Sequence, residues 1–545
     1  LKPLWLKTSP WRSHGSNSLA DTLFFSVSIV MYNIVLMLAC LVCGCHGRRA
    51  LSTAQLEPNP HAQTLKRLAT LLLAESPRVG FNFGDAAASF RVLNPTVLDG
   101  QKCLGHRTFS IKMREGSSEK LQRRPLALNR RALLAAAGMS CVMPTAAKAS
   151  FEGAEWPLWP ALPLAPYERR KTVKQEAVPG RVWTFEQLLG VFYVHVPIRM
   201  TVVRLDSGGL FVYAPIAPTA ECLSLLQPLI EAYGPIKSIV LPSVAPEHKV
   251  LAGPFARKFP SAALYTTDRQ YSFPLNLPEQ WLGFPGKVNA LPSSSSVSNP
   301  FGDEFEFEVL TAKASKESVY QDAAFYHKPS QTLLVCDAVV STNPEPPPIL
   351  LSEPEYRRAL LYHARDDPLE KVEDTPEVRR KGWERIVLFA NFFMPGSLVK
   401  LENDVWLSAA PKTPMPELGW GGVLPFTWRE STSKAFKAFS ADGKPVVVPI
   451  IQIIFSRAPQ TAMKWVEKVS SWDFRRVVPA HFDAPIPMDS KEFVETFKFL
   501  AKGKNEVRFC DEDVLFLREA LEGLPPNLAL FDTPLGPLRG PKCNL

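Results

Sequence analysis

The sequence predicts an α/β protein that is built in layers. Short β-rich runs are joined by two hairpin signals, "DSGG" at 206–209 and "KPSQ" at 328–331. Amphipathic helical segments alternate with further β-rich runs, which is the pattern of sheets covered by helices. Two of these runs carry polar residues toward their ends, Asp337 and His481, and strand ends are where such folds place their chemistry.

The first half of the predicted domain begins with a hairpin. The runs "RMTVVRL" (199–205) and "LFVYAPI" (210–216) have the β-branched and aromatic content of strands. Thr219 is the expected N-cap of a helix that ends at Gly234 and that Pro228 is expected to kink. The next elements are a buried strand, a helix and a strand: 237–241, 250–260 and 262–267.

The second half predicts three strands, a long interruption and a mixed ending. The strands are 303–310, 323–328 and 332–340. Residues 343–446 are rich in proline and then charged and helical, and we expect them to be a largely peripheral insertion. The elements after it are a helix, a strand that ends in a His–Asp pair, and two helices: 450–472, 474–486, 490–503 and 511–523.

Residues 1–149 are predicted to be a disordered targeting leader. The segment 31–47, "MYNIVLMLACLVCGCHG", has the polar start, apolar core and small-residue end of a secretory signal peptide. The longer apolar run 24–44 leaves a membrane anchor as the alternative. Residues 48–127 are poor in acids and lack periodicity, which is typical of a transit peptide.

The last part of this leader, 128–149, resembles a twin-arginine export signal. It has the pair Arg130-Arg131, a mild apolar core and the small-residue ending "AKA". A buried or amphipathic helix is the alternative. The order of the three signals resembles proteins of algae with complex plastids, whose last destination is the thylakoid lumen. The mature protein is then expected to start near Ser150 and to have an N-terminal extension at 150–179.

Composition limits the possible partners. The chain has a net charge of +9, and much of the basic excess precedes residue 150. No basic face is therefore predicted on the folded part, which excludes nucleic acid as a partner. The mature protein is not expected to be transmembrane, and its partner is expected to be a small molecule or a plastid protein.

The chain has nine cysteines, and those that follow residue 150 contain no CxxC motif. Five of them precede residue 150, and four follow it: Cys222, Cys336, Cys510 and Cys543. These four are predicted to be buried or surface thiols, with a single disulfide among them as the alternative.

Three long segments resemble a known family. They are "IVLPSVAPEHKVLAGPFARKFP" (239–260), "FYHKPSQTLLVCDAVV" (325–340) and "RRVVPAHFDAPI" (475–486). In this order they are similar to an uncharacterised domain family of plant and algal chloroplast proteins and of bacteria, which is related to the metallo-β-lactamase fold. The resemblance implies a metallo-β-lactamase-like αββα sandwich over 180–505, followed by a C-terminal helix and tail at 506–545. It implies no particular activity.

The resemblance also implies a degenerate metal site. The first metal motif of the superfamily is HxHxDH, and Ser243 and Ala245 stand where its two leading histidines belong. The first of the two metal sites is therefore expected to be lost. The ligands of the second site map to Glu247, His248, Asp337 and His481.

Two histidines and two carboxylates suit one Zn, Fe or Mn ion. Asp483 is the expected acceptor that orients His481 from outside the ligand set. The alternative is a metal-free site, in which His248 caps a helix, Asp337 binds backbone amides and His481 is a satisfied core histidine. Three other histidines fit no ligand pattern and are expected to be structural or exposed: His195, His327 and His363.

The predicted function is that of a non-catalytic binding or assembly protein which reuses the fold. The alternative is a mononuclear metal-dependent hydrolase of an ester, thioester or amide, since a bound metal polarises a carbonyl and lowers the pKa of water. The fold alone does not choose between them. No GxSxG motif occurs, and Cys336 lies inside a predicted strand, so neither a serine nor a cysteine nucleophile is favoured.

Overall fold

The computed structural model describes residues 164–165, 170–191, 193–270, 284, 286–313, 319–418, 422–501, 505–522 and 535–545. These residues all belong to one compact unit of the chain. The predicted targeting leader lies outside them, as does much of the predicted extension. Within the described part of the chain, no helix has the length and apolar character that crossing a bilayer requires.

The larger sheet has eight strands among the described residues, in the order β1-β3-β4-β5-β6-β7-β8, and β2 pairs with β3. The strands from β1 to β5 pair in antiparallel fashion, and β5 to β8 pair in parallel. Their bounds are β1 Leu164–Ala165, β2 Val173–Val178, β3 Val182–Val191, β4 Val196–Arg204, β5 Leu210–Tyr213, β6 Ile236–Leu241, β7 Ala263–Thr266 and β8 Val288–Ala290.

The smaller sheet has the order β15-β14-β11-β10-β9. Strands β9, β10 and β11 form an antiparallel meander, and β14 pairs in parallel with β11, so that Val335 lies opposite Pro479. The bounds are β9 Phe305–Lys313, β10 Val319–His327, β11 Thr332–Val335, β14 Arg476–Pro479 and β15 Ile486–Pro487. A separate hairpin consists of β12 Leu398–Lys400 and β13 Phe426–Trp428.

The two sheets pack face to face over a core to which both contribute. Phe211 and Tyr213 of β5 share one buried cluster with Phe325 of β10. Successive side chains of a strand point to opposite faces. Leu210 and Val212 therefore lie on the outer face of the larger sheet, where they form a second core with helices.

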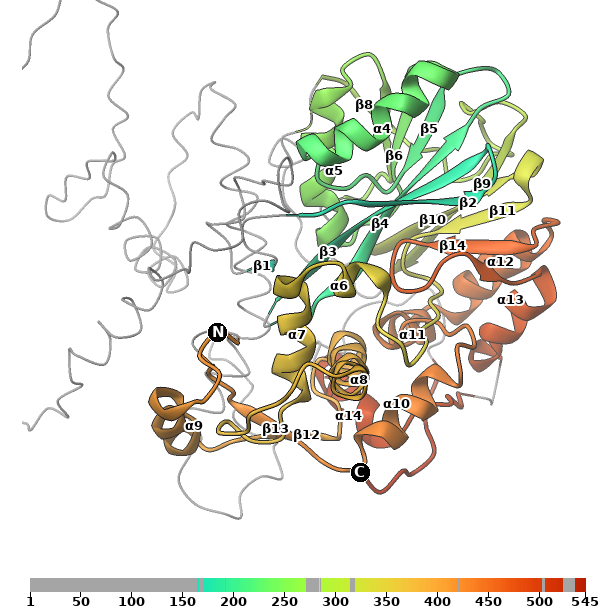
Figure 1. The fold of residues 1–545 in the computed structure, drawn as a ribbon. Helices are drawn as coiled ribbons and strands as arrows, with labels where there is room; N and C mark the ends of the chain where they lie inside the picture. Colours follow the sequence, from blue (N-terminus) through green and yellow to red (C-terminus); the bar gives the residue numbers. More distant parts are fainter. Residues whose placement is uncertain are drawn as a thin grey trace, which may run out of the picture. The chain divides into compact units, whose positions relative to one another are not determined.

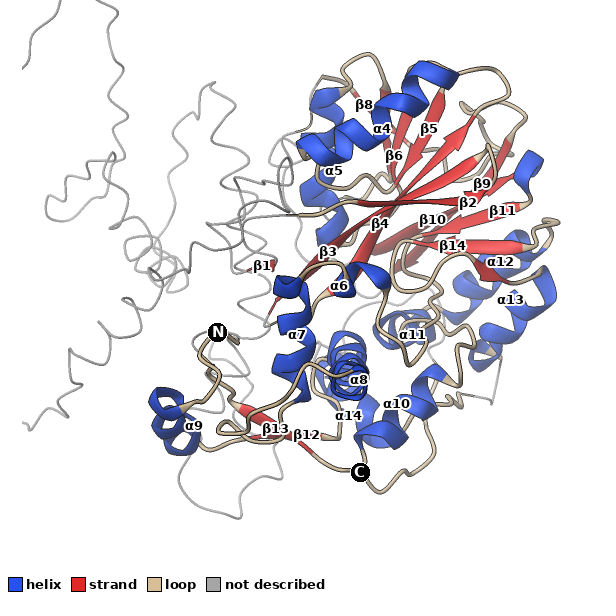
Figure 2. Cartoon of the chain, viewed as in Figure 1, coloured by secondary structure: helices blue, strands red, loops and turns tan. Residues whose placement is uncertain are grey.

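Helices cover both outer faces, so the αββα sandwich that the sequence predicts is confirmed (Figures 1 and 2). Helices α4 (Ala220–Tyr233) and α5 (Pro246–Lys258) cover the larger sheet. Helices α11 and α12 pack on β9 of the smaller sheet, and most other helices of the C-terminal half share one buried core with them. Their bounds are α6 Pro348–Leu351, α7 Pro354–Ala364, α8 Pro376–Phe392, α10 Thr432–Ser440, α11 Pro449–Arg457, α12 Pro459–Ser470, α13 Ser490–Thr496 and α14 Asp511–Glu522. Helix α9 (Asn403–Ala409) lies outside this core, and short 3₁₀ turns are η4 Lys328–Ser330, η5 Ala410–Lys412 and η6 Lys498–Leu500.

Several local predictions are confirmed by the structure. Thr219 caps α4, because its side chain accepts the backbone N–H of Cys222 at 3.1 Å. The helix ends at Gly234 and contains Pro228. Both hairpin signals join antiparallel strands, β4 to β5 and β10 to β11.

The predicted insertion at 343–446 is not peripheral, which corrects the expectation from the sequence. Leu360 of α7 and Trp383 of α8 belong to the same buried cluster as Leu333 of β11. The apolar residues of these helices are interspersed with charged ones, so the pattern resembles an exposed helix although one face is buried. The predicted helix 450–472 is also divided, because a new helix begins at Pro459.

The C-terminal segment is fastened to the domain by a disulfide. Cys510, which immediately precedes α14, is bonded to Cys543. Cys222 and Cys336 are buried free thiols. Of the two readings of the four late cysteines, the one with a single disulfide is therefore confirmed.

Candidate metal centre

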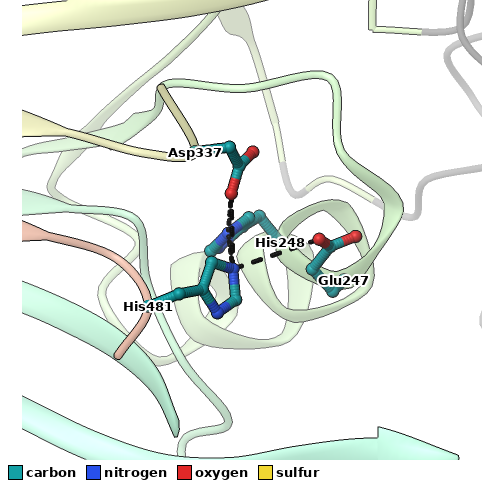
Figure 3. Close-up of side chains that lie close together, drawn as sticks. All are labelled: Glu247, His248, Asp337 and His481. Atoms are coloured by element: carbon teal, nitrogen blue, oxygen red, sulfur yellow. Dashed lines mark hydrogen bonds and ion pairs between the residues drawn. The ribbon is translucent and has the colours of Figure 1, made fainter. Parts of the chain in front are cut away.

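The four predicted ligands meet beside the ends of the strands that precede them (Figure 3). Glu247 and His248 lie in the first turn of α5, which follows β6 after a short loop. Asp337 lies two residues beyond β11, and His481 lies two residues beyond β14. Because β11 and β14 are parallel neighbours whose last residues are paired, these two side chains leave the same edge of the sheet.

The donor atoms of these residues form a tight group. Nε2 of His248 lies 3.2 Å from Nε2 of His481. Oδ1 of Asp337 lies 3.3 Å from Nε2 of His481 and 3.7 Å from Nε2 of His248. Oε1 of Glu247 lies 4.0 Å from Nε2 of His481, and one donor atom of each residue lies within 4.8 Å of the other three.

Burial differs across the group. The side chain of His248 is fully buried, whereas those of Asp337 and His481 are 10% and 12% exposed. The side chain of Glu247 is 21% exposed. Solvent therefore reaches the cluster mainly on the side of Glu247.

Two polar side chains orient Asp337. The hydroxyl of Ser243 donates to Oδ2 at 3.0 Å, which leaves Oδ1 facing the histidines. Asp322 of β10 is fully buried and accepts the backbone N–H groups of Cys336, Asp337 and Ala338 at 3.4, 3.0 and 3.1 Å. Asp322 thereby shapes the turn that carries Asp337. It was not predicted, and its signal in the sequence is an acidic residue inside a strand that is buried along its length.

His481 is oriented by the backbone. Its Nδ1 lies 2.9 Å from the carbonyl oxygen of Pro197. A carbonyl only accepts, so this hydrogen bond assigns the hydrogen to Nδ1 and leaves a lone pair on Nε2 of the neutral ring. The orienting role expected of Asp483 thus falls to Pro197. The carboxylate of Asp483 accepts from Nδ2 of Asn343 at 2.7 Å instead.

The charged groups of the cluster change each other's protonation. Burial opposes ionisation of Asp337, but hydrogen bonds from His248 and His481 outweigh burial and hold the pKa of Asp337 below its usual range. Burial also opposes protonation of His481, but Asp337 and then Glu247 raise the pKa of His481 above its ordinary value. Without a metal, the cluster therefore favours a protonated His481 paired with an ionised Asp337.

The spacing of the donors fits a single metal ion. Ligands bound at 2.0–2.2 Å in a tetrahedral zinc site lie about 3.3–3.6 Å apart. The three distances among His248, Asp337 and His481 bracket this range. Glu247 is somewhat farther away, with Oε1 4.0 Å from Nε2 of His481, and its side chain is partly exposed.

Ser243 limits the cluster to one ion. Its hydroxyl occupies Oδ2 of Asp337, the oxygen that is turned away from the histidines, and also accepts the backbone N–H of Ala245 at 3.1 Å. Neither Ser243 nor Ala245 offers an imidazole. Asp337 is therefore arranged to ligate through one oxygen and not to bridge two ions.

The three other histidines that the structure describes take no part in the cluster. His195, His327 and His363 are all buried, in keeping with the structural role expected of them. Nδ1 of His327 is paired with the hydroxyl of Ser330 at 2.7 Å.

A cleft of about 830 Å³ beside α8 and the start of α10 contains none of the four ligands. Several of its charged groups are paired with one another. Lys381 and Arg385 both form ion pairs with Asp366. The hydroxyl of Ser433 donates to Glu384 at 2.7 Å. Because these charges are satisfied internally, the cleft is a weaker candidate site than the histidine cluster.

The fold and the cluster define a class of protein: an αββα sandwich with one cluster of side chains that could hold a metal ion. Residues 179–499, more than half of the chain, match the family described as "Domain of unknown function (DUF4336)", and the chain belongs to this family. No curated protein matches the chain.

Solved structures similar to the chain include metallo-β-lactamases and flavo-di-iron proteins. The DIM-1 metallo-β-lactamase exposed to ceftazidime is 10% identical with a TM-score of 0.30, over 61% of this chain and 98% of that one. A mutant flavo-di-iron protein from Thermotoga maritima is 10% identical with a TM-score of 0.31, over 62% and 64%. The metallo-β-lactamase from Pontibacter korlensis is 13% identical with a TM-score of 0.23, over 31% and 74%.

Proposed function

We propose that this domain binds one divalent metal ion through His248, Asp337 and His481, with Glu247 as the fourth ligand. The observation that carries the proposal is the spacing of 3.2–3.7 Å among the first three donor atoms. Two nitrogen and two oxygen donors suit zinc, and Fe²⁺ and Mn²⁺ are the alternatives.

A metal with four protein ligands is closed to substrate, as in structural zinc sites. We therefore propose that the domain is a non-catalytic binding or assembly protein whose sandwich the ion stabilises. The ion would join α5, which packs on the larger sheet, to the ends of β11 and β14 in the smaller sheet. Its partner would be a small molecule or another protein of the same compartment.

A mononuclear hydrolase is the second candidate, and the position of Glu247 favours it. Oε1 of Glu247 lies 4.0 Å from Nε2 of His481, farther than the other donors, and its side chain is the most exposed of the four. If Glu247 stays outside the coordination sphere, it is placed to act as a general base. A bound metal would supply polarisation of an ester, thioester or amide carbonyl.

For its location, we propose a plastid compartment, the thylakoid lumen, with the membrane anchor at 24–44 as the alternative. The proposal rests on the order of signals in the leader. The Cys510–Cys543 disulfide supports it, because structural disulfides persist mainly in oxidising compartments outside the cytosol.

The first experiment measures metal in the purified full-length chain and in the double variant His248→Ala/His481→Ala. We expect about one ion per chain in the wild type and none in the double variant. His327→Ala is the matched control, since it removes a buried histidine outside the cluster and should retain the ion. A wild-type chain that takes up no Zn²⁺, Fe²⁺ or Mn²⁺ at micromolar concentration would refute the proposal.

A second experiment, with Glu247→Gln, separates the two candidate functions. If Glu247 is a ligand, the substitution lowers metal affinity, and neither protein hydrolyses a generic ester or thioester. If Glu247 is a base, the wild type hydrolyses such a substrate, whereas the variant keeps its metal and loses the activity. Asp337→Ala should lose the metal in either case.

A further inference from the structure

The turn that carries His481 is held by one residue from the opposite sheet, Arg199 of β4. The backbone N–H of Arg199 donates to the carbonyl of Ala480 at 2.8 Å. Its Nη1 donates to the carbonyl of Pro479 at 2.6 Å and, over a longer distance of 3.5 Å, to that of His481. Its Nη2 donates to the carbonyl of Phe482. Arg199 therefore donates a hydrogen bond to every backbone carbonyl of the turn 479–482.

The charge of Arg199 is compensated by an ion pair with the carboxylate of Glu186. Arg199 is only 2% exposed, and a buried charge needs both a counter-charge and hydrogen bonds. Glu186 lies directly opposite on β3, and its Oε1 accepts from Nε at 2.8 Å and from Nη2 at 2.6 Å. A lysine ammonium is a compact point charge, so it cannot reach Glu186 and the turn carbonyls together.

His481 in turn forms hydrogen bonds with β4, the strand that carries Arg199. The Nδ1–H of His481 donates to Pro197, two residues before Arg199, and the backbone of Ile198 forms a bridge with His481. Phe482 has a φ of +56°, a conformation that costs free energy for a residue other than glycine. Such a conformation persists only where its surroundings determine it. The hydrogen bond from Arg199 to the Phe482 carbonyl is one such determinant.

We propose that Arg199, with Glu186 as its counter-charge, is the positioning residue of the metal centre. It holds the turn 479–482 so that Nε2 of His481 stays beside the donor atoms of His248 and Asp337. Arg199 touches neither the ion nor a substrate and acts through His481. This inference rests on the proposed metal-binding function.

The test compares Arg199→Lys with Arg385→Lys in the full-length chain. Arg385 of α8 is 3% exposed, donates to the three consecutive carbonyls of residues 363–365 and pairs with Asp366. It is a matched control for the loss of a buried guanidinium away from the cluster. The readouts are Zn²⁺ affinity by competition titration and the visible spectrum of the Co²⁺ form, which reports ligand geometry.

We expect Arg199→Lys to weaken Zn²⁺ binding on the order of 10- to 100-fold and to alter the Co²⁺ spectrum. Arg385→Lys should leave both unchanged. Equal effects of the two substitutions, or no effect of Arg199→Lys, would overturn the inference. If Arg199→Lys fails to fold, Glu186→Gln replaces it under the same criteria, because it keeps the acceptor oxygen and removes only the charge.

A readout that needs no metal distinguishes failure of this inference from failure of the proposed function. The Nδ1–H signal of His481, identified in isotope-labelled protein by its loss in His481→Ala, should be protected from exchange in the wild type. It should remain protected in Arg385→Lys and lose protection in Arg199→Lys. If the wild type binds no metal, the proposed function fails and this signal alone decides the positioning role. A protected signal in Arg199→Lys would then overturn that role.

Discussion

The two carboxylate oxygens of Asp337 have different partners, and this difference determines how Asp337 faces the candidate site. Oδ1 faces two imidazoles, and Oδ2 is engaged by the hydroxyl of Ser243. The turn beneath it is held by Asp322 through three backbone N–H groups. The carboxylate of Asp337 is thus positioned by the hydroxyl of Ser243 and, through the backbone, by Asp322.

Asp322→Asn should destabilise the protein by about 1–3 kcal/mol, because an amide group then faces backbone N–H groups that need an acceptor. The measurement is the free energy of unfolding in urea, made without metal. Asp303→Asn makes the same chemical change at an exposed turn and should stay within about 0.5 kcal/mol of the wild type. Equal effects of the two substitutions would contradict the assigned role of Asp322.

Asp513 leads to a prediction about pH. It is fully buried and accepts the backbone N–H of Gly396 at 2.9 Å, and burial raises its pKa to about 7. In the unfolded chain an aspartate releases its proton near about pH 3.9. Between these values the folded state holds the proton and the unfolded state does not, so this residue makes stability fall as pH rises from about 4 to about 7.

The measurement is the melting temperature of the wild type and of Asp513→Asn across that pH range. The melting temperature of the variant should rise relative to that of the wild type as pH increases from about 4 to about 7. Above about pH 7 the difference between the two melting temperatures should stay constant. A difference that does not change with pH would show that Asp513 does not titrate in this window.

The candidate ligands were predictable from the sequence, whereas the residues that hold them were not. Asp337 and His481 follow strands that are visible in the sequence, and the family resemblance joins them to His248. Arg199 and Asp322 bind mostly backbone atoms that are distant in sequence, so no motif pairs them. Their only local signal is a charge inside a β-rich run.

At the scale of elements, the contact between α7 and α8 depends on one glycine. A Cβ placed on Gly382 would lie 1.9 Å from the carbonyl oxygen of Leu360. This close approach lets the two helices pack as part of the core. A glycine gives no apolar signal in the sequence, so this close approach adds to the reasons why the region was not recognised as core.

Gly382→Ala should destabilise the protein although alanine favours helices. The helix propensity gained is about 1 kcal/mol. The clash is with backbone and requires a helix to move, for which overpacking typically costs about 1–3 kcal/mol. We therefore expect a net loss in the free energy of unfolding. Arg380→Ala, at an exposed position of the same helix, should change it by less than about 1 kcal/mol, and a stabilised Gly382→Ala would contradict the close packing.

Elements were predictable where their signals are local. The cap at Thr219 and the two hairpin loops need only neighbouring residues, and all are present. Strand β3 was missed, although Phe185 and Leu188 are fully buried. Its glutamate and glutamine interrupt the apolar pattern, because their partners, Arg199 among them, lie on other segments.

For the molecule as a whole, the Cys510–Cys543 disulfide closes a loop with a sequence separation of 33 residues. Its reduction should lower the free energy of unfolding by about 2–4 kcal/mol, mainly because the unfolded chain becomes less restricted. Denaturation with and without a reductant measures the effect. Cys543→Ser, which cannot form the disulfide, should have about the stability of the reduced wild type both with and without reductant. If the reductant lowered the free energy of unfolding of the wild type and of the variant equally, its effect would not come from this disulfide.

The parallel pairing of β11 with β14 also determines when the site is completed during synthesis. Thr332 lies opposite Arg476, and helices α6 to α12 are made between these residues. A nascent chain emerges N-terminus first, so β6, α5 and β9 to β11 are available while β14 is still on the ribosome. Until β14 arrives, β11 is an open sheet edge, a template for wrong pairing. That edge of the growing polypeptide therefore stays unpaired through this interval, and the candidate metal cluster is complete only once translation has passed His481.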